Sequence, residues 1–302
     1  MNKMENCKVN DEVNITEANK TAIKDKILGG RARFNGIYFF ASDSIVVCKE
    51  FEKGFKLTRR RSKVNQNQGI LSKIPFVRSL IKLRMLVRLL LMTMGKVPKA
   101  LVLSVLFVSL FSDLFFLMHP YYYQATSSAS TLDSFRYLFY VALLFSVVLL
   151  VTGNFKSFFN GLLNLFRFHG AEHKAINAAM EDEPLTVAKV KSQSRISYRC
   201  GTTLVVIYLP LVILMNTFFG TVMFLNVVFS LVVAMEVFTL MRNRYFFFAL
   251  KPILWVSAAI QYLIMTKEPT DKQVEAATYA VRMIGEESCI PWEQRIFYRG
   301  GG

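Results

Sequence analysis

The strongest constraint on this chain is a run of 39 residues, 202–240, that contains no Lys or Arg. It is roughly twice as long as one membrane-spanning helix needs to be. Two further apolar runs cover 100–118 and 137–152. Because soluble helices keep a polar stripe that most of these runs lack, we predict membrane-spanning helices. The long run is expected to form a helical hairpin that turns near 216–221, which gives four spans.

The positive charge of the chain is concentrated at its front. Residues 1–99 hold 21 Lys and Arg against 8 Asp and Glu, a net charge of +13, whereas the whole chain carries +16. The later Lys and Arg residues number one in 119–136, seven in 153–201 and eight after Leu240. Since cytoplasmic segments carry the excess of Lys and Arg, we predict a multi-pass protein of the cell membrane. Both termini and the 153–201 loop are expected in the cytoplasm.

Composition excludes several other classes of protein. A chain that is 53% hydrophobic and contains 27 Phe is not disordered. Its four Cys are far apart and form no C-x-x-C motif, which argues against a secreted disulfide scaffold. A soluble nucleic-acid-binding protein can be equally basic but does not carry long uncharged apolar runs. We therefore predict no nucleic-acid partner.

The order of the remaining segments predicts the domain organisation. A polar tail covers 1–28, and β-branched and aromatic runs separated by turns predict a small cytoplasmic β element at 29–62. In 74–98, Arg and Lys interleave with Leu and Ile, which predicts a basic amphipathic helix lying on anionic lipids. The four-span domain is expected at 99–241, followed by an apolar helix and a C-terminal helix in 242–302. The predicted fold class is therefore an all-α membrane protein with a small N-terminal β element.

One motif in the 153–201 loop has the spacing of a metal site. His169, Glu172 and His173 form H-x-x-E-H, and two of the three His of the chain fall in it. On a helix, positions i and i+4 lie on one face, so the two imidazoles can bind one divalent metal, for which zinc is the best match. Glu172 is then a candidate general base that polarises water, as in the inverted zincin motif. A hydrogen-bonded network without metal is the alternative.

A catalytic zinc requires a third protein ligand and one open position. The sequence offers Cys200, just before the long apolar run, and Glu236 within it. The acidic run at 181–183 supplies further candidates, namely Glu181, Asp182 and Glu183. Three cations lie nearby in the sequence: Lys174, Arg195 and Arg199. They are predicted to contact a lipid phosphate or an acidic substrate. The alternative is that they only contribute to the excess of positive charge on the cytoplasmic side.

Several of these motifs occur together in a known family. The segments HGAEHK at 169–174 and RCGT at 199–202 are specific, and the segments at 29–36 and 73–76 are looser matches. Together they resemble the YqhQ-like family of bacterial multi-pass membrane proteins, which are described as predicted metal-dependent enzymes. The resemblance implies a metal site at His169 and His173 with Glu172 and Cys200.

These observations predict a function at the cytoplasmic face of the membrane. The leading hypothesis is a metal-dependent hydrolase, with a peptidase-like reaction catalysed by Glu172 at a zinc ion. The alternative hypothesis is a non-catalytic scaffold or accessory subunit of a membrane complex. In both cases the expected partners are a bilayer containing anionic lipids and a second membrane protein.

Overall fold

The chain divides into two compact units. The computed structural model describes residues 23–61, 73–93, 155–181, 184–219, 223–241, 243–285 and 292–297. The first unit contains residues 1–66, 156–200 and 257–302, and the second contains 67–155 and 201–256. Because three segments far apart in the sequence build the first unit, its fold depends on long-range contacts.

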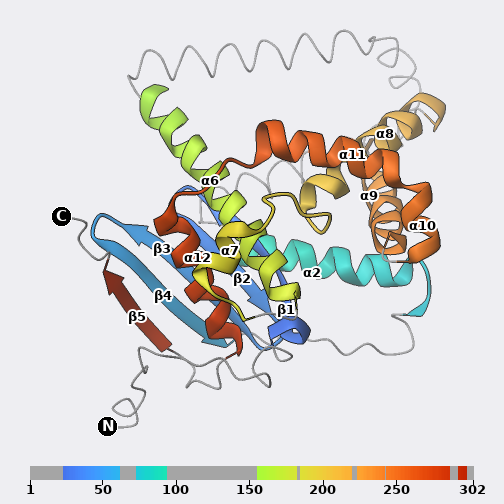
Figure 1. Cartoon of the computed structure of the whole chain (residues 1–302). Coiled ribbons are helices and arrows are strands. Elements are labelled where there is room, and N and C mark those ends of the chain that lie inside the picture. Colours follow the sequence, from blue (N-terminus) through green and yellow to red (C-terminus); the bar gives the residue numbers. More distant parts are fainter. Residues whose placement is uncertain are drawn as a thin grey trace. The chain divides into compact units, whose positions relative to one another are not determined.

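The first unit is built on a five-stranded antiparallel sheet with the order β1-β2-β3-β4-β5 (Figure 1). Strands β1 to β4 form a meander, and β5 pairs with β4 although most of the chain separates them in sequence. The bounds of the strands are β1 Ile27–Arg33, β2 Gly36–Ala41, β3 Ser44–Phe51, β4 Gly54–Arg61 and β5 Trp292–Phe297.

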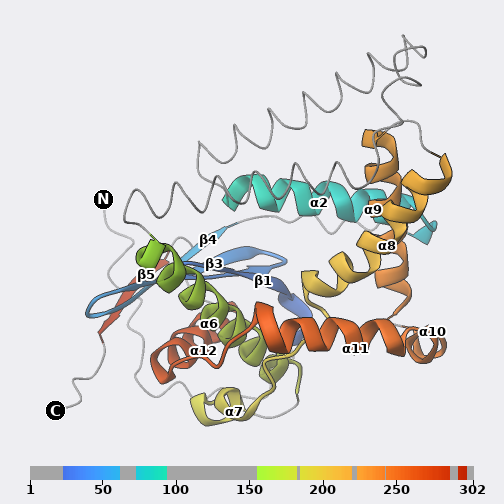
Figure 2. The same cartoon turned by 90° about the horizontal axis from the view of Figure 1, so that it is seen from above.

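The core of the first unit lies between the sheet and two helices. Phe39 of β2, Cys48 of β3 and Leu57 of β4 are almost fully buried, and the strand register places them on one face. Helices α6 (Phe155–Met180) and α12 (Asp271–Gly285) contribute small residues such as Ala171 and Ala277 to the same core. Both helices lie on the same side of the sheet (Figure 2). A short helix, α7 (Val187–Ser192), follows α6 and contacts α12.

The second unit is helical among its described residues. Its helices are α2 Val77–Thr93, α8 Gly201–Phe219, α9 Met223–Leu240, α10 Arg244–Ala249 and α11 Lys251–Ile260, the last of which ends in the first unit. Helix α9 contacts both α8 and α2. A small apolar cluster joins α8, α9 and α11 and includes Ile207, Ala234 and Leu254. Helix α2 lies inside the segment expected to form the basic amphipathic helix.

The prediction of an all-α fold is wrong. The first unit contains a five-stranded sheet that supplies much of its core. The sequence predicts strands within 29–62, but β1 begins two residues earlier, at Ile27. The sequence predicts no strand at Trp292–Phe297, because the partner of that strand, β4, lies far away in the sequence.

The prediction of four transmembrane helices is also wrong. In the part of the chain that the structure describes, no helix has both the length and the apolar character required to cross a membrane. Helices α8 and α9 contain 19 and 18 residues. At a rise of 1.5 Å per residue they are about 27–29 Å long, which is below the roughly 30 Å of a hydrocarbon core. Helix α8 also contains Pro210. The predicted spans at 100–118 and 137–152 lie outside the described residues.

Candidate metal centre

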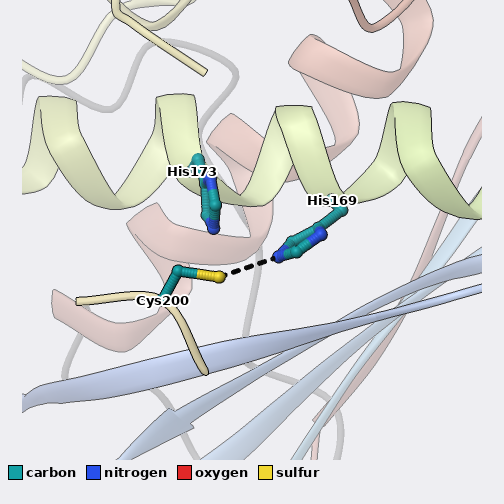
Figure 3. Close-up of side chains that lie close together, drawn as sticks. All are labelled: His169, His173 and Cys200. Atoms are coloured by element: carbon teal, nitrogen blue, oxygen red, sulfur yellow. Dashed lines mark hydrogen bonds between the residues drawn. The ribbon is translucent and has the colours of Figure 1, made fainter. Parts of the chain in front are cut away.

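Helix α6 presents both histidines of the H-x-x-E-H motif on one face, as their spacing predicts. The ring centroids of His169 and His173 are 4.4 Å apart. Cys200 ends the segment that follows α7, and its Sγ lies 3.4 Å from Nε2 of His169. One ligand atom from each of the three residues lies within 4.8 Å of the others. Figure 3 shows the thiol and the two rings converging on the same point.

Two backbone carbonyls fix the orientation of the imidazole rings. Nδ1 of His169 lies 2.9 Å from the Met265 carbonyl oxygen, and Nδ1 of His173 lies 2.7 Å from that of Arg195. Because a carbonyl oxygen only accepts hydrogen bonds, each Nδ1 donates. In the neutral ring, Nε2 therefore carries the lone pair, which is the form that binds a metal. Such hydrogen bonds to the second ring nitrogen are typical of metal-binding histidines.

The three side chains fit a zinc ion. Tetrahedral zinc, with Zn–N near 2.0–2.1 Å and Zn–S near 2.3 Å, separates a nitrogen from a sulfur ligand by about 3.6 Å. The observed separation between His169 Nε2 and Cys200 Sγ is 3.4 Å. Two imidazoles and a thiol suit zinc and related transition metals, whereas magnesium and calcium prefer oxygen ligands. Three protein ligands also leave one tetrahedral position for substrate or water, as in catalytic zinc sites.

Glu172 is buried between α6 and strand β1 and is not part of this cluster. Its carboxylate accepts a hydrogen bond from the backbone N–H of Ala32. Burial raises the pKa of Glu172 to about 7, although the charge interaction with His169 and the bond from Ala32 act in the opposite direction. A carboxyl group with this pKa is able both to accept and to release a proton near neutral pH.

Within the described residues, the His, Cys, Asp and Glu side chains that could hold a metal together are His169, His173 and Cys200. Glu236, the other predicted third ligand, belongs to the second unit and has partners there. It accepts hydrogen bonds from Ser79 Oγ at 2.7 Å and Phe76 N at 3.3 Å, and it forms an ion pair with Arg78. The hydrogen bond from Arg78, supported by those from Ser79 and Phe76, lowers the pKa of Glu236 despite burial.

The candidates in the acidic run at 181–183 are not part of the cluster among the described residues either. Glu181 forms an ion pair with Lys189 at 2.5 Å. Asp182 and Glu183 lie outside the described residues. Of the predicted third ligands, Cys200 is therefore the one that lies with the histidines.

The three predicted substrate contacts have partners within the first unit. Lys174 is buried, donates to the Lys191 carbonyl at 2.9 Å and pairs with Glu268 at 2.8 Å. The Arg195 guanidinium lies 4.3 Å from the centre of the Tyr262 ring. Arg199 Nη1 lies 3.1 Å from the sulfur of Met180. The contacts of Lys174 hold α6 to neighbouring segments, and a role of any of the three cations in substrate binding stays a prediction.

Comparison with known proteins identifies the family. A family model described as "Protein of unknown function (DUF1385)" matches residues 62–287. The chain belongs to this family. The matched region includes all three residues of the candidate metal cluster, as well as Glu172.

A curated relative is similar over a shorter region. The "Uncharacterized protein YqhQ" of Bacillus subtilis (strain 168) is 35% identical over 127 residues, which is 37% of this chain and 38% of that protein. The chain therefore spans about two fifths of the length of this relative. No solved structure matches the chain. The predicted resemblance to the YqhQ-like family is confirmed at the level of the family, while Gly29 and Gly30 precede the matched region.

The structure gives Gly170, the glycine inside the HGAEHK motif, a role that was not predicted from sequence. A Cβ atom at this position would lie 2.2 Å from the Lys267 carbonyl oxygen. The backbone N–H of Lys267 also donates to the Phe166 carbonyl at 3.0 Å, so the segment that begins at Met265 runs against α6. Gly170 thus permits the close approach that brings the Met265 carbonyl to His169. A glycine in an otherwise regular helix was the available signal.

Replacing Gly170 with alanine is expected to destabilise the protein by about 1–3 kcal/mol, as overpacking does. In an ordinary helix position, replacing glycine with alanine stabilises the helix by up to about 1 kcal/mol, so the expected effect at Gly170 has the opposite sign. Gly161 in the same helix is the matched control, since a Cβ there would meet the movable, half-exposed ring of Phe34 at 3.3 Å. The free energy of unfolding in denaturant measures both variants. Equal stability of G170A and G161A would contradict the role assigned to Gly170.

Gly30 makes room for Glu172. A Cβ atom at residue 30 would lie 2.7 Å from both Cγ and Oε1 of Glu172. The G30A substitution is therefore expected to destabilise the wild type by about 1–3 kcal/mol. It should cost much less in an E172A background, where the clashing atoms are absent. A double-mutant cycle of unfolding free energies measures the coupling, and strict additivity of the two substitutions would show that this contact is unimportant.

Proposed function

We propose that this protein is a metal-dependent hydrolase that cleaves peptide-type bonds. The observation that carries the proposal is the convergence of two imidazole Nε2 atoms and a thiol, with both Nδ1 atoms held by backbone carbonyls. A purely structural network would not require both rings to turn the same nitrogen toward a cysteine. A zinc ion in such a site supplies Lewis acidity and promotes attack by water at neutral pH.

Glu172 is the proposed general base. In this role its carboxylate accepts a proton from the attacking water and passes it to the amine that leaves. Three features support the assignment: Glu172 precedes His173 directly, its carboxyl group is buried, and its pKa is raised to about 7. With that pKa, both protonation states are populated near neutral pH, which the two half-steps require.

A specific contact favours one other reaction class, thiol catalysis. Cys200 Sγ and His169 Nε2 are 3.4 Å apart, which is also the arrangement of a nucleophilic cysteine beside its base. This alternative gives no role to His173, whose Nδ1 is oriented in the same way as that of His169. The metal site explains all three side chains and is therefore the proposed function.

An assay with chelation distinguishes the two reactions. The full chain, loaded with zinc, is incubated with a mixture of synthetic peptides, and mass spectrometry detects new termini. The proposal expects cleavage that stops when zinc is removed and returns when zinc is added back. Cleavage that persists in the chelated protein but is abolished by thiol alkylation would favour the cysteine nucleophile. An absence of cleavage by the zinc-loaded protein would overturn the hydrolase proposal.

A further inference from the structure

Gln261 is a fully buried polar residue next to the candidate metal centre. It lies where α11 gives way to a single π-helical turn, η2 (Gln261–Met265). Its side-chain Oε1 accepts a hydrogen bond from the backbone N–H of Ser197 at 3.0 Å, and its Nε2 donates to Ser257 Oγ at 3.0 Å. Its own carbonyl accepts bonds from both the N–H and the hydroxyl of Thr266. Both polar atoms of the side chain and the backbone carbonyl thus have hydrogen-bond partners.

The side chain of Gln261 holds the segment that supplies one ligand and orients another. Ser197, which donates to Gln261, lies two residues after Arg195, whose carbonyl accepts from His173. The Ser197 carbonyl in turn accepts the N–H of Cys200 at 3.2 Å. One hydrogen bond from Gln261 therefore fixes the middle of a segment with the His173 acceptor before it and the thiol after it.

The backbone of Gln261 closes the π-helical turn whose last residue orients His169, the third side chain of the cluster. The bonds from Thr266 to the Gln261 carbonyl end this turn immediately after Met265, whose carbonyl accepts from His169. Single π turns inside or at the end of α-helices occur frequently at functional sites, since they redirect backbone groups. Gln261 thus binds Ser197 and Thr266. These two residues lie close to the carbonyls that orient His169 and His173, and Ser197 also accepts the N–H of Cys200.

We propose that Gln261 is a positioning residue of the metal centre, which holds His169, His173 and Cys200 in register for zinc. This inference rests on the metal site of the proposed function. Loss of a group outside the ligand shell typically lowers metal affinity by 10–100-fold. Replacing Gln261 with leucine keeps a similar volume but leaves the Ser197 N–H without its acceptor. The zinc affinity of Q261L is expected to fall within that range.

Two companion variants separate positioning from general stability. S257A removes the partner of Gln261 Nε2 but keeps the bond from Ser197, so its zinc affinity should stay within about threefold of wild type. Q261E also keeps an acceptor for Ser197, because a carboxyl group accepts this bond in either protonation state. We therefore expect Q261E to restore most of the affinity that Q261L loses, which also tests the inference if Q261L does not fold.

The experiment is a zinc titration of the full-length chain against a chromophoric chelator, with thermal unfolding of the metal-free proteins in parallel. The inference is supported if Q261L binds zinc at least tenfold more weakly than S257A, or if Q261L does not fold but Q261E keeps near-wild-type affinity. It is overturned if Q261L retains wild-type affinity, if S257A loses as much affinity as Q261L, or if Q261E folds but binds zinc at least tenfold more weakly than wild type. A wild type that binds no zinc would refute the proposed function and, with it, this inference. Wild-type binding without a Gln261 effect would refute the inference alone.

Discussion

Replacing His173 with alanine is expected to lower the affinity of the protein for zinc by more than about 100-fold, since even outer-shell changes cost 10–100-fold. His173 contributes one of three converging ligand atoms, and its ring is held by the Arg195 carbonyl at 2.7 Å. The remaining imidazole and thiol would form a two-ligand site that competes poorly with water. Zinc affinity is measured by titration of the metal-free protein, and circular dichroism verifies that the variant is folded.

The third histidine of the chain supplies the matched control for this substitution. His119 lies outside the described residues and outside the H-x-x-E-H motif. H119A removes the same side chain type and should bind zinc as the wild type does. If H173A and H119A bind zinc equally well, the metal is held elsewhere and the assignment of His173 fails.

Replacing Glu172 with glutamine is expected to lower hydrolysis by about 10²–10⁴-fold, the usual contribution of a general acid–base group. Glutamine has nearly the same shape as the buried carboxyl group but does not accept a proton from water. Because Glu172 lies outside the ligand cluster, E172Q should keep its zinc within about tenfold of wild-type affinity. The rate of peptide cleavage and the zinc content, measured on the same sample, test both parts.

Glu181 provides the corresponding control for E172Q. It follows the last residue of α6 and is paired with Lys189 at the surface, so E181Q makes the same chemical change away from the cluster. We expect E181Q to cleave at the wild-type rate. Full activity of zinc-loaded E172Q would exclude Glu172 as the base even if the metal site is correct.

The placement of the two candidate ligand histidines on one face could be predicted from sequence because helical periodicity is local. His169 and His173 are four residues apart, and that spacing alone places them on one face of α6. The choice between Cys200 and Glu236 could not be made in this way, since both are distant in sequence and only the tertiary fold decides which one is near. The sequence also could not identify the carbonyls of Met265 and Arg195 as the hydrogen-bond acceptors of the two rings. Every residue has a carbonyl, and no sequence pattern marks the one that orients a ring.

The fold was predictable where neighbouring segments pair with each other. The β-branched and aromatic runs that form β2, β3 and β4, separated by turns, indicated strands, because hairpins join consecutive segments. Strand β5 pairs with β4 from the other end of the chain, and no local signal specifies that partner. The prediction of spanning helices failed for α8 and α9 because an apolar run reflects composition, whereas crossing a membrane requires a single helix that is both long and apolar enough.

The cobalt spectrum of the metal-free protein tests the three-ligand site most directly. Cobalt replaces zinc in tetrahedral sites, and a bound thiolate adds an intense charge-transfer absorption. We predict that the wild type binds one equivalent of cobalt, with intense tetrahedral bands and the thiolate absorption. C200S should lose the thiolate absorption, and H169A and H173A should lose the tetrahedral bands. A wild-type protein that binds no cobalt, or a cobalt spectrum unchanged in C200S, would contradict a metal centre at His169, His173 and Cys200.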